Sequence, residues 1–315
     1  MPTLLSRTDL EVILPHRGIN LFIDEVKVSP DKLSSSSRLR LRDVPSCTKL
    51  LTRNGPSGTI WYEPFMAELL ALTGAPLVSR DLPPGHVAAF GMLSRVKFGT
   101  MPSPDDEVLA EVTVQRKRDQ TTFFKARLEN HGVVILEAEV ASSVVDLAVF
   151  AFRPPAPALP DGGTPICMSS FGWKDSRLRL LDCILSEDAV ALRLSAGFTF
   201  TACHPFVQGH FPTAPLMMGV LQWAAMVDAV WLAYTRFGCD SSTILANGSV
   251  KRGDGTLVAE IKDLLIEIID GAPYIRETKR VIFREPVYLT NRVIVEVTLC
   301  VAADQPVVPA LAGSA

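Results

Sequence analysis

Apolar residues along the chain form helical segments and alternating strand segments, and the same order recurs in both halves. The helical segments are EPFMAELLALT at 63–73 and MGVLQWAAMVDAVWLAY at 218–234. The second is rich in good helix formers and apolar nearly all round, which predicts a buried helix. Segments such as FFKARLE and ILEAEVA alternate apolar and polar residues, which is typical of a sheet with one dry face. We therefore expect an α+β repeat, with an antiparallel sheet wrapped around a long central helix in each half.

A segment rich in proline and glycine divides the chain near its midpoint. Residues 153–165 read RPPAPALPDGGTP, a composition that favours an extended linker. The predicted domains are therefore residues 1–152 and 166–303, with a frayed tail at 304–315. Each domain opens on a short apolar run, LFIDEV in the first and LRLLDCI in the second, and an offset of 158 residues aligns the two runs.

Composition and charge narrow the class of protein. Of the 315 residues, 48% are hydrophobic and 21% are charged, a balance typical of globular domains rather than of disorder. The formal net charge is −3 without any block of lysine and arginine, so nothing indicates a nucleic-acid partner. No apolar stretch approaches the roughly 18 residues of a membrane span, and the N-terminus lacks the pattern of a secretory signal. The six cysteines are scattered without metal-like spacing, which favours reduced thiols in a cytoplasmic protein and no metal site.

One motif carries candidate chemistry. Residues 206–222 read FVQGHFPTAPLMMGVLQ. This segment resembles the active-site segment of the hotdog-fold β-hydroxyacyl-acyl-carrier-protein dehydratases, in which a G-H-F-P turn precedes a proline-containing loop and the glycine that starts the central helix. ILPHRGINLFIDEV at 13–26 resembles the opening segment of that family, and RVKFGTMPSPDDEVLAEV at 95–112 resembles its post-helix strands. The resemblance implies a double hotdog, with two fused halves that pair like a dimer.

The resemblance makes His210 the candidate base, and the physical chemistry agrees. Removal of the weakly acidic α-proton of a thioester suits an imidazole, whose ordinary pKa is about 6.5. Gly219 lies where the helix begins, and the free N–H groups of a helix N-terminus suit the charge that develops on the thioester oxygen. The alternative for His210 is a histidine that merely packs a turn. We expect a structural role for His16 and a place near the mouth of the site for His204.

The acid is expected from the other half of the chain. In the family it lies fourteen residues after the histidine, and that position here is Ala224. Residues 54–68 align with residues 210–224 without a gap, which places Asn54 on His210 and Glu68 on Ala224. The resemblance therefore implies one composite site of His210, Gly219 and Glu68, and one degenerate site of Asn54 and Ala224. Two alternatives remain open, namely that Glu68 is an exposed helix charge and that the acid has moved to Asp228, one helical turn after Ala224.

The expected reaction is dehydration of a 3-hydroxyacyl thioester to the trans-2-enoyl thioester, in fatty-acid or polyketide-type biosynthesis. The substrate would be carried on the phosphopantetheine of an acyl carrier protein or of coenzyme A, without a metal or redox cofactor. Candidate side chains for an acyl tunnel, each of which could instead be core, are Phe206, Phe211, Leu216, Met217 and Trp223. Thioester hydrolysis and a non-catalytic acyl-carrier-binding subunit are the alternative functions, and a homo-oligomer of such pseudo-dimers is possible.

The sequence leaves the layout of the second sheet open. KRVIFREPVYLTNRVIVEV at 279–297 resembles the family's first two post-helix strands, but too few residues follow to complete a sheet. Either TLVAEIKDLLIEII at 256–269 supplies the missing strands, or the sheet is rearranged.

Overall fold

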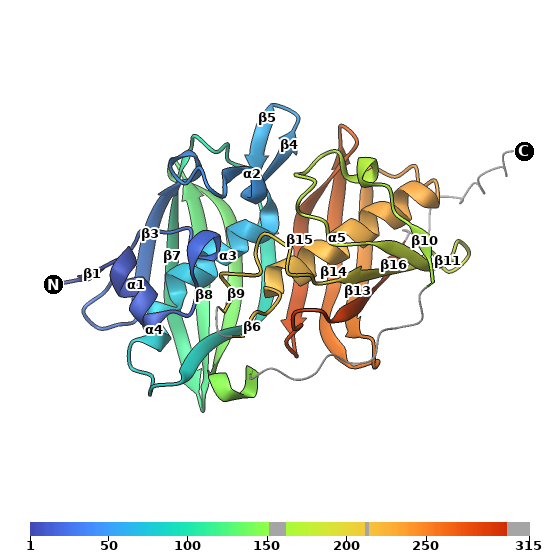
Figure 1. The fold of residues 1–315 in the computed structure, drawn as a ribbon. Helices are drawn as coiled ribbons and strands as arrows, with labels where there is room; N and C mark the ends of the chain where they lie inside the picture. Colours follow the sequence, from blue (N-terminus) through green and yellow to red (C-terminus); the bar gives the residue numbers. More distant parts are fainter. Residues whose placement is uncertain (151–161, 212–213, 301–315) are drawn as a thin grey trace, which may run out of the picture.

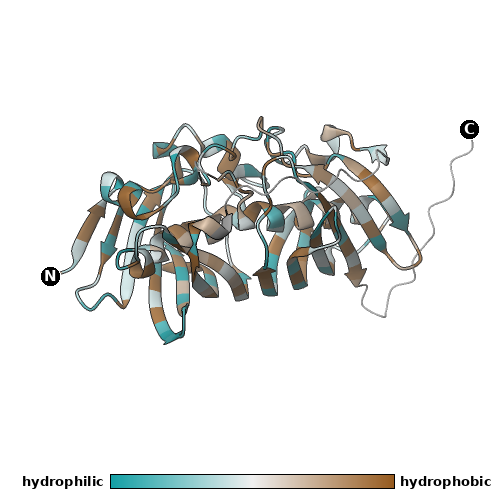
Figure 2. Ribbon diagram, turned by 60° about the horizontal axis from the view of Figure 1, so that its bottom comes forward, coloured by the Kyte–Doolittle hydropathy of each residue, from teal (hydrophilic) through white to brown (hydrophobic). Residues whose placement is uncertain are grey.

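One large antiparallel sheet organises the molecule. The computed structural model describes residues 1–150, 162–211 and 214–300. Within these ranges, fourteen strands form a continuous sheet, and a two-stranded hairpin of β4 and β5 stands beside it (Figure 1). The helices and most connecting loops lie on one side of this sheet (Figure 2).

The elements of both halves have these bounds. The helices are α1 (Arg7–Ile13), α2 (Thr48–Leu51), α3 (Glu63–Gly74), α4 (Pro76–Ser79) and α5 (Gly219–Arg236). The strands of the first half are β1 (Thr3–Ser6), β2 (Glu25–Val28), β3 (Ser34–Arg40), β4 (Thr52–Gly55), β5 (Gly58–Trp61), β6 (His86–Phe98), β7 (Glu107–Arg118), β8 (Thr121–Asn130) and β9 (Val133–Asp146). Those of the second half are β10 (Thr164–Pro165), β11 (Cys183–Asp188), β12 (Arg193–Thr199), β13 (Thr243–Arg252), β14 (Leu257–Ile269), β15 (Ala272–Phe283) and β16 (Arg292–Cys300).

Helices α3 and α5 coincide with the two apolar helical segments of the sequence. In α3 every residue except Ala71 is buried, including Glu63 and Glu68. In α5 the residues from Val220 to Ala233 are all buried. Each helix packs against its own half of the sheet, and the two helices contact each other. Burial all round matches the weak separation of apolar and polar faces in both segments.

The two halves of the sheet join through β6 and β15. These strands pair antiparallel, with Leu93 opposite Val281 and Lys97 opposite Glu277. Backbone hydrogen bonds therefore make the sheets around the two helices continuous. The pairing covers residues 92–97 of β6 and 277–282 of β15, so these parts of the two strand edges are not open to other strands.

The second half of the sheet uses its strands in a permuted order. From the outer side to the junction, the first half reads β3, β7, β8, β9 and β6, and the second reads β12, β16, β13, β14 and β15. Strands β15 and β16 therefore take the places of β6 and β7, while β13 and β14 take those of β8 and β9. Strands β8 and β9 follow β7 in the first half, whereas their counterparts β13 and β14 precede β15 in the second. The segment at 256–269 forms β14, so the missing strands do come from earlier in the chain.

The termini and linker are only partly described. The predicted linker at 153–165 lies mostly outside the described residues, and its last two residues form β10, which pairs with β11. The predicted tail at 304–315 lies wholly outside them. Among the helices that the structure describes, none is both long and apolar enough to cross a membrane.

Candidate active site

A cavity of about 400 Å³ lies between the two halves. Helix α3 and strands β6 and β9 of the first half form one wall. The loop before α5, the start of α5 and the end of β15 form the other. His210, Glu68 and Gly219 all line this cavity, so the candidate base, acid and helix-start glycine come together from both halves.

The loop that carries His210 is held by the opening segment of the first half. The Arg17 N–H donates to the Gly209 carbonyl oxygen at 2.9 Å, and Asn20 Nδ2 donates to the Phe206 carbonyl oxygen at 3.2 Å. A Cβ atom on Gly209 would lie 2.1 Å from both the Arg17 carbonyl oxygen and Asn20 Nδ2, so only glycine fits. The glycine of the G-H-F-P turn is therefore required by close contact between the halves.

The environment of His210 suits a base. Its Nδ1 lies 3.2 Å from the Leu216 carbonyl oxygen, and the Leu216 N–H donates to the His210 carbonyl oxygen at 2.7 Å. Because a carbonyl can only accept, Nδ1 carries the proton and Nε2 carries the free lone pair. Burial lowers the pKa of His210 to about 4, so the ring is neutral at physiological pH. A neutral imidazole with a free Nε2 can take up a proton.

Glu68 is buried rather than exposed. Only 8% of the residue is accessible, which excludes the alternative of a solvated helix charge. Burial raises the pKa of its carboxyl group to about 7. Near neutral pH a substantial fraction of Glu68 is therefore protonated and able to donate a proton.

Gly219 begins α5 at the cavity wall. The first N–H groups of an α-helix have no partner inside the helix and form its positive end. A Cβ atom on Gly219 would lie 3.0 Å from the ring of Phe283, so a side chain would displace that ring or enter the cavity. The glycine therefore keeps the helix N-terminus open to a ligand oxygen.

Polar residues of the cavity that the sequence reasoning did not place there include His16 and Gln222. His16 Nε2 lies 4.0 Å from Glu68 Oε1, and the centroids of the His16 and His210 rings are 5.1 Å apart. Gln222 Oε1 is buried without a hydrogen-bond partner among the described residues. The resemblance of the segment at 13–26 to the family's opening segment was the signal that could have placed His16 at the site.

The expected tunnel residues divide into two groups. Phe211, Leu216 and Met217 line the cavity. Phe206 and Trp223 do not, which corrects the expectation: Phe206 stacks on Phe65 with ring centroids 5.2 Å apart, and Trp223 packs against Phe98. Successive helical residues point about 100° apart, so Gln222 reaches the cavity while Trp223 faces the core.

His204 is also misplaced by the sequence reasoning. It does not line the cavity but is buried, with rings of Phe198, Phe200 and Phe206 around it. Burial lowers its pKa to about 4. His204 is therefore part of the core behind the His210 loop.

The residues aligned with the cavity residues form what we call the sister site: Arg53, Asn54, Glu63, Lys174, Ala224 and Asp228. Asn54 lies on β4, where its N–H donates to the Trp173 carbonyl oxygen at 2.8 Å, and Ala224 is fully buried. The alternative acid Asp228 is buried here, away from the cavity, and forms an ion pair with Lys174. Burial raises the pKa of Asp228 to about 6, and Lys174 opposes that shift.

A second buried ion pair occupies the sister site. Arg53 Nε donates to Glu63 Oε2 at 2.9 Å, and the Ile275 N–H donates to Glu63 Oε1 at 3.1 Å. The Arg53 guanidinium also stacks on the Tyr274 ring, 3.8 Å from its centroid. Both side chains of the pair are fully inaccessible to solvent. Two buried ion pairs therefore occupy the sister site, although Arg53 Nη1 and Asp228 Oδ1 have no hydrogen-bond partner among the described residues.

Comparison with known proteins identifies relatives of this chain. No family model matches it. It is 28% identical over 138 residues to the 3-hydroxyacyl-[acyl-carrier-protein] dehydratase FabZ of Ligilactobacillus salivarius, covering 44% of this chain and 96% of that protein. It is 28% identical over 148 residues to FabZ of Caulobacter sp. (strain K31), covering 45% of this chain and 89% of that protein.

Solved structures give weaker matches. The dehydratase heterocomplex ApeI:P from Xenorhabdus doucetiae matches with 11% identity and a TM-score of 0.36, over 44% of this chain and 92% of that one. A mutant thioesterase from Pseudomonas aeruginosa matches with 13% identity and a TM-score of 0.35, over 45% of this chain and 95% of that one.

The sequence matches and the motif at 206–222 point the same way. Each FabZ relative is matched over most of its own length but over less than half of this chain. The architecture, rich in strands and with few helices in its described part, fits the hotdog fold. The chain is thus related to the hotdog-fold 3-hydroxyacyl-acyl-carrier-protein dehydratases.

Proposed function

We propose that the chain is a double hotdog that dehydrates a 3-hydroxyacyl thioester to the trans-2-enoyl thioester at one composite active site. The observation that carries the proposal is the single cavity lined by Glu68 of the first half and by His210 and Gly219 of the second. The halves would pair as the two subunits of a dimer do, with the sister site inactive.

His210 would act as the base. Its Nε2 removes the α-proton, and the C–H electron pair becomes the new C=C bond. The neutral state favoured by burial is the state that this step requires. Proton transfer by a positioned side chain typically contributes about 10²–10⁴-fold to a rate.

Glu68 would act as the acid. Its protonated carboxyl group delivers a proton to the β-hydroxyl as the C–O bond breaks, and water leaves. A pKa of about 7 keeps the proton available without holding it too tightly. The backbone N–H of Gly219 would donate to the thioester oxygen, where negative charge develops during α-proton removal.

The apolar part of the cavity would take the acyl chain. Its wall in the first half is apolar and includes four small residues, Ala71 and Ala75 on the helical side and Ala88 and Ala89 on β6. Such a wall suits a hydrocarbon tail, while the opposite end near Glu285 is polar. The substrate would arrive on phosphopantetheine, from an acyl carrier protein in a cytoplasmic pathway of fatty-acid type, without a metal or redox cofactor. No group of three or more His, Cys, Asp or Glu side chains in the described ranges is arranged to bind a metal.

The test follows two products at once. Purified protein would be incubated with 3-hydroxyacyl thioesters of several chain lengths, on both an acyl carrier protein and coenzyme A. Enoyl thioester and free thiol would be measured together. We expect enoyl product from the wild type, and about 10²-fold less from Glu68→Gln.

The matched control is Asp228→Asn, the same kind of change at the sister site, which should retain activity. Loss of enoyl product in Asp228→Asn but not in Glu68→Gln would contradict the composite site. Thiol release without enoyl product would make the protein a thioesterase instead.

A further inference from the structure

After the proposed dehydration, His210 holds a proton that it must lose, and Glu68 lacks a proton that it must regain. In each turnover His210 Nε2 gains the α-proton, and Glu68 loses a proton to the departing water. The product leaves behind an imidazolium at His210 and a carboxylate at Glu68. Before the next substrate can react, one proton must move from the first group to the second.

We propose that His16 returns this proton, by accepting it from His210 at one ring nitrogen while giving one to Glu68 from the other. This inference rests on the proposed function and goes beyond it by assigning a third titratable residue to the cycle. The protons balance, because His16 accepts one from His210 at Nδ1 and gives one to Glu68 from Nε2. The transfer leaves His16 as its Nδ1–H tautomer, which must return to the Nε2–H tautomer before the next relay.

The distances place His16 close to both groups. Its Nε2 is 4.0 Å from Glu68 Oε1, and its ring centroid is 5.1 Å from that of His210. His16 Nδ1 is buried and has no hydrogen-bond partner among the described residues, so it is available to accept. His210 Nδ1 is already bonded to the Leu216 carbonyl oxygen, which leaves Nε2 as the atom that carries the proton away. A neutral imidazole has one donor and one acceptor nitrogen, which is what a relay requires.

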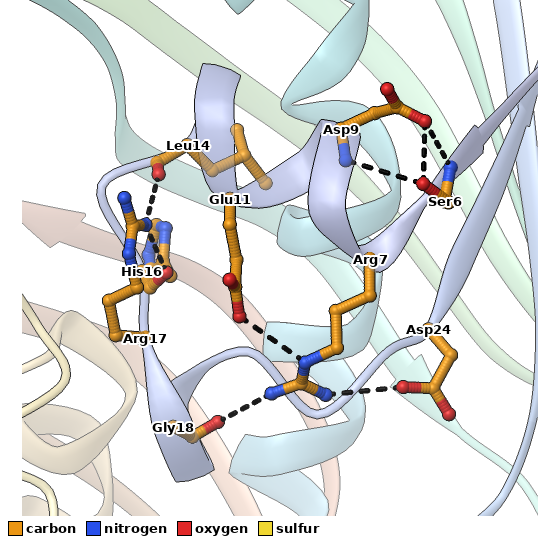
Figure 3. A network of polar contacts seen from close by, with 9 residues as sticks. All are labelled: Ser6, Arg7, Asp9, Glu11, Leu14, His16, Arg17, Gly18 and Asp24. Carbon is orange, nitrogen blue, oxygen red and sulfur yellow. Dashed lines mark hydrogen bonds and ion pairs between the residues drawn. The ribbon is translucent and has the colours of Figure 1, made fainter.

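The loop around His16 is braced by arginines. Arg17 Nη1 donates to the carbonyl oxygens of Leu14 at 2.7 Å and of His16 at 2.6 Å. Arg7 donates to the Gly18 carbonyl oxygen at 3.2 Å, as Figure 3 shows. These bonds fix the backbone on both sides of the imidazole. The edge-to-face contact with Phe211, 5.5 Å between centroids, orients the ring.

The sister site supplies an internal comparison. An offset of 158 residues aligns His16 with Lys174, whose ammonium is held by Asp228. A lysine in an ion pair has no free lone pair and cannot pass on a proton. The sister site has Asn54 at the position of His210, and it likewise has Lys174 at the position of His16.

The state of His16 before the reaction is also suitable. Burial lowers its pKa well below the ordinary value, and the nearby His210 adds to this shift. The ring is therefore neutral until the carboxylate of Glu68 is formed beside it. That carboxylate then favours the transfer, since an opposite charge nearby stabilises a passing imidazolium.

The experiment separates the first turnover from later ones. Rapid-quench kinetics would compare wild type, His16→Gln and His16→Ala on one 3-hydroxyacyl thioester. Glutamine keeps polar contacts but cannot relay a proton. We expect His16→Gln to form about one enoyl thioester per chain at nearly the wild-type rate, followed by a steady state at least about 10-fold slower. In His16→Ala, added imidazole should restore the steady state.

The matched control is His131→Gln, which makes the same change at an exposed histidine far from the cavity. A first turnover that slows as much as the steady state would overturn the relay and leave His16 a structural role. An unchanged steady state in His16→Gln would overturn it as well. A wild type that forms no enoyl product would refute the dehydratase proposal itself, and the relay with it.

Discussion

The cavity and the sister site occupy equivalent places in the pairing of the two halves, but the cavity is lined by Glu68 and His210, whereas the sister site holds two buried ion pairs. At the cavity, Gly219 begins α5 without a side chain, and Gly209 packs closely against Arg17 and Asn20. The aligned residues at the sister site are Arg53 and Glu63, whose side chains form a buried ion pair. The same alignment places Glu68 of the cavity on Ala224.

The apolar walls also differ in side-chain size, with larger residues at the sister site than at the cavity. The offset of 156 residues that aligns Glu68 with Ala224 also aligns Ala75 with Trp231. Because β15 takes the place of β6, RVKF at 95–98 aligns with RVIF at 280–283, and Ala89 then aligns with Tyr274. Ala75 and Ala89 of the cavity thus align with large aromatic residues of the sister site. Under the proposed function, the difference teaches that a fused pair can give up one active site by placing large side chains there, which avoids the cost of an empty buried space.

The largest effect should come from the base. His210→Ala should lower kcat/KM by about 10³-fold, because the sister site has no histidine to replace it. The measurement is enoyl formation at saturating and limiting thioester. Asn54→Ala, at the aligned position, should change the rate by less than about twofold, since surface changes away from a site have small effects. Equal losses in both variants would show that both sites work.

The buried ion pair of the sister site should be the next most sensitive feature. Lys174→Met leaves Asp228 buried without its cation, and the free energy of unfolding should fall by about 3–5 kcal/mol. Urea unfolding measures this loss. The double variant Lys174→Met/Asp228→Leu removes both charges and should recover most of it. If the double variant is no more stable than the single one, the pair does not act as a unit.

Introducing into the cavity a large side chain like that of the sister site should change the range of acyl-chain lengths that the protein accepts. Ala75 lies seven residues beyond Glu68, about 10 Å along a helix axis. Ala75→Trp should lower kcat/KM for long acyl chains by roughly 10–200-fold and leave the shortest chain almost unaffected. The reverse change, Trp231→Ala, is the matched control and should not alter chain-length preference. A uniform loss across all lengths would mean that the acyl chain does not run along this wall.

The pH dependence should be the mildest test. Activity requires neutral His210, which exists above a pKa of about 4, and protonated Glu68, which exists below a pKa of about 7. The profile of kcat/KM should therefore be flat between these values and fall by about tenfold per pH unit beyond either limit. In Glu68→Gln the alkaline limb should disappear, because glutamine does not titrate. An alkaline limb that persists in this variant would assign it to another group.

Much of the active site could be predicted from sequence because its residues lie in short, contiguous segments. The gapless alignment of residues 54–68 with 210–224 placed Glu68 on Ala224, and the resemblance to the dehydratase family implied that Glu68 shares a site with His210. What it could not supply was the direction of each side chain. Trp223 and Gln222 are neighbours in the same apolar helix, and only the packed structure shows that Gln222 faces the cavity.

The strand order of the second half of the sheet could not be predicted from the sequence, for a different reason. Alternation of apolar and polar residues identifies β13 to β16 as strands, but it does not say which strands are neighbours. Neighbours are fixed by long-range pairing, such as Leu93 with Val281 across the junction. His16 was missed on similar grounds, since its distance to Glu68 depends on how the opening segment folds back.

The permuted sheet has a consequence for the order in which the molecule can be made. Strand β16 comes after β13, β14 and β15 along the chain but lies between β12 and β13 in space. The first half has all its strands once residue 146 has left the ribosome, and can fold while the second is being synthesised. The second half keeps two strand edges open until residues 292–300 arrive. A nascent chain that stops short of them contains both Glu68 and His210 but cannot complete the sheet that holds them face to face.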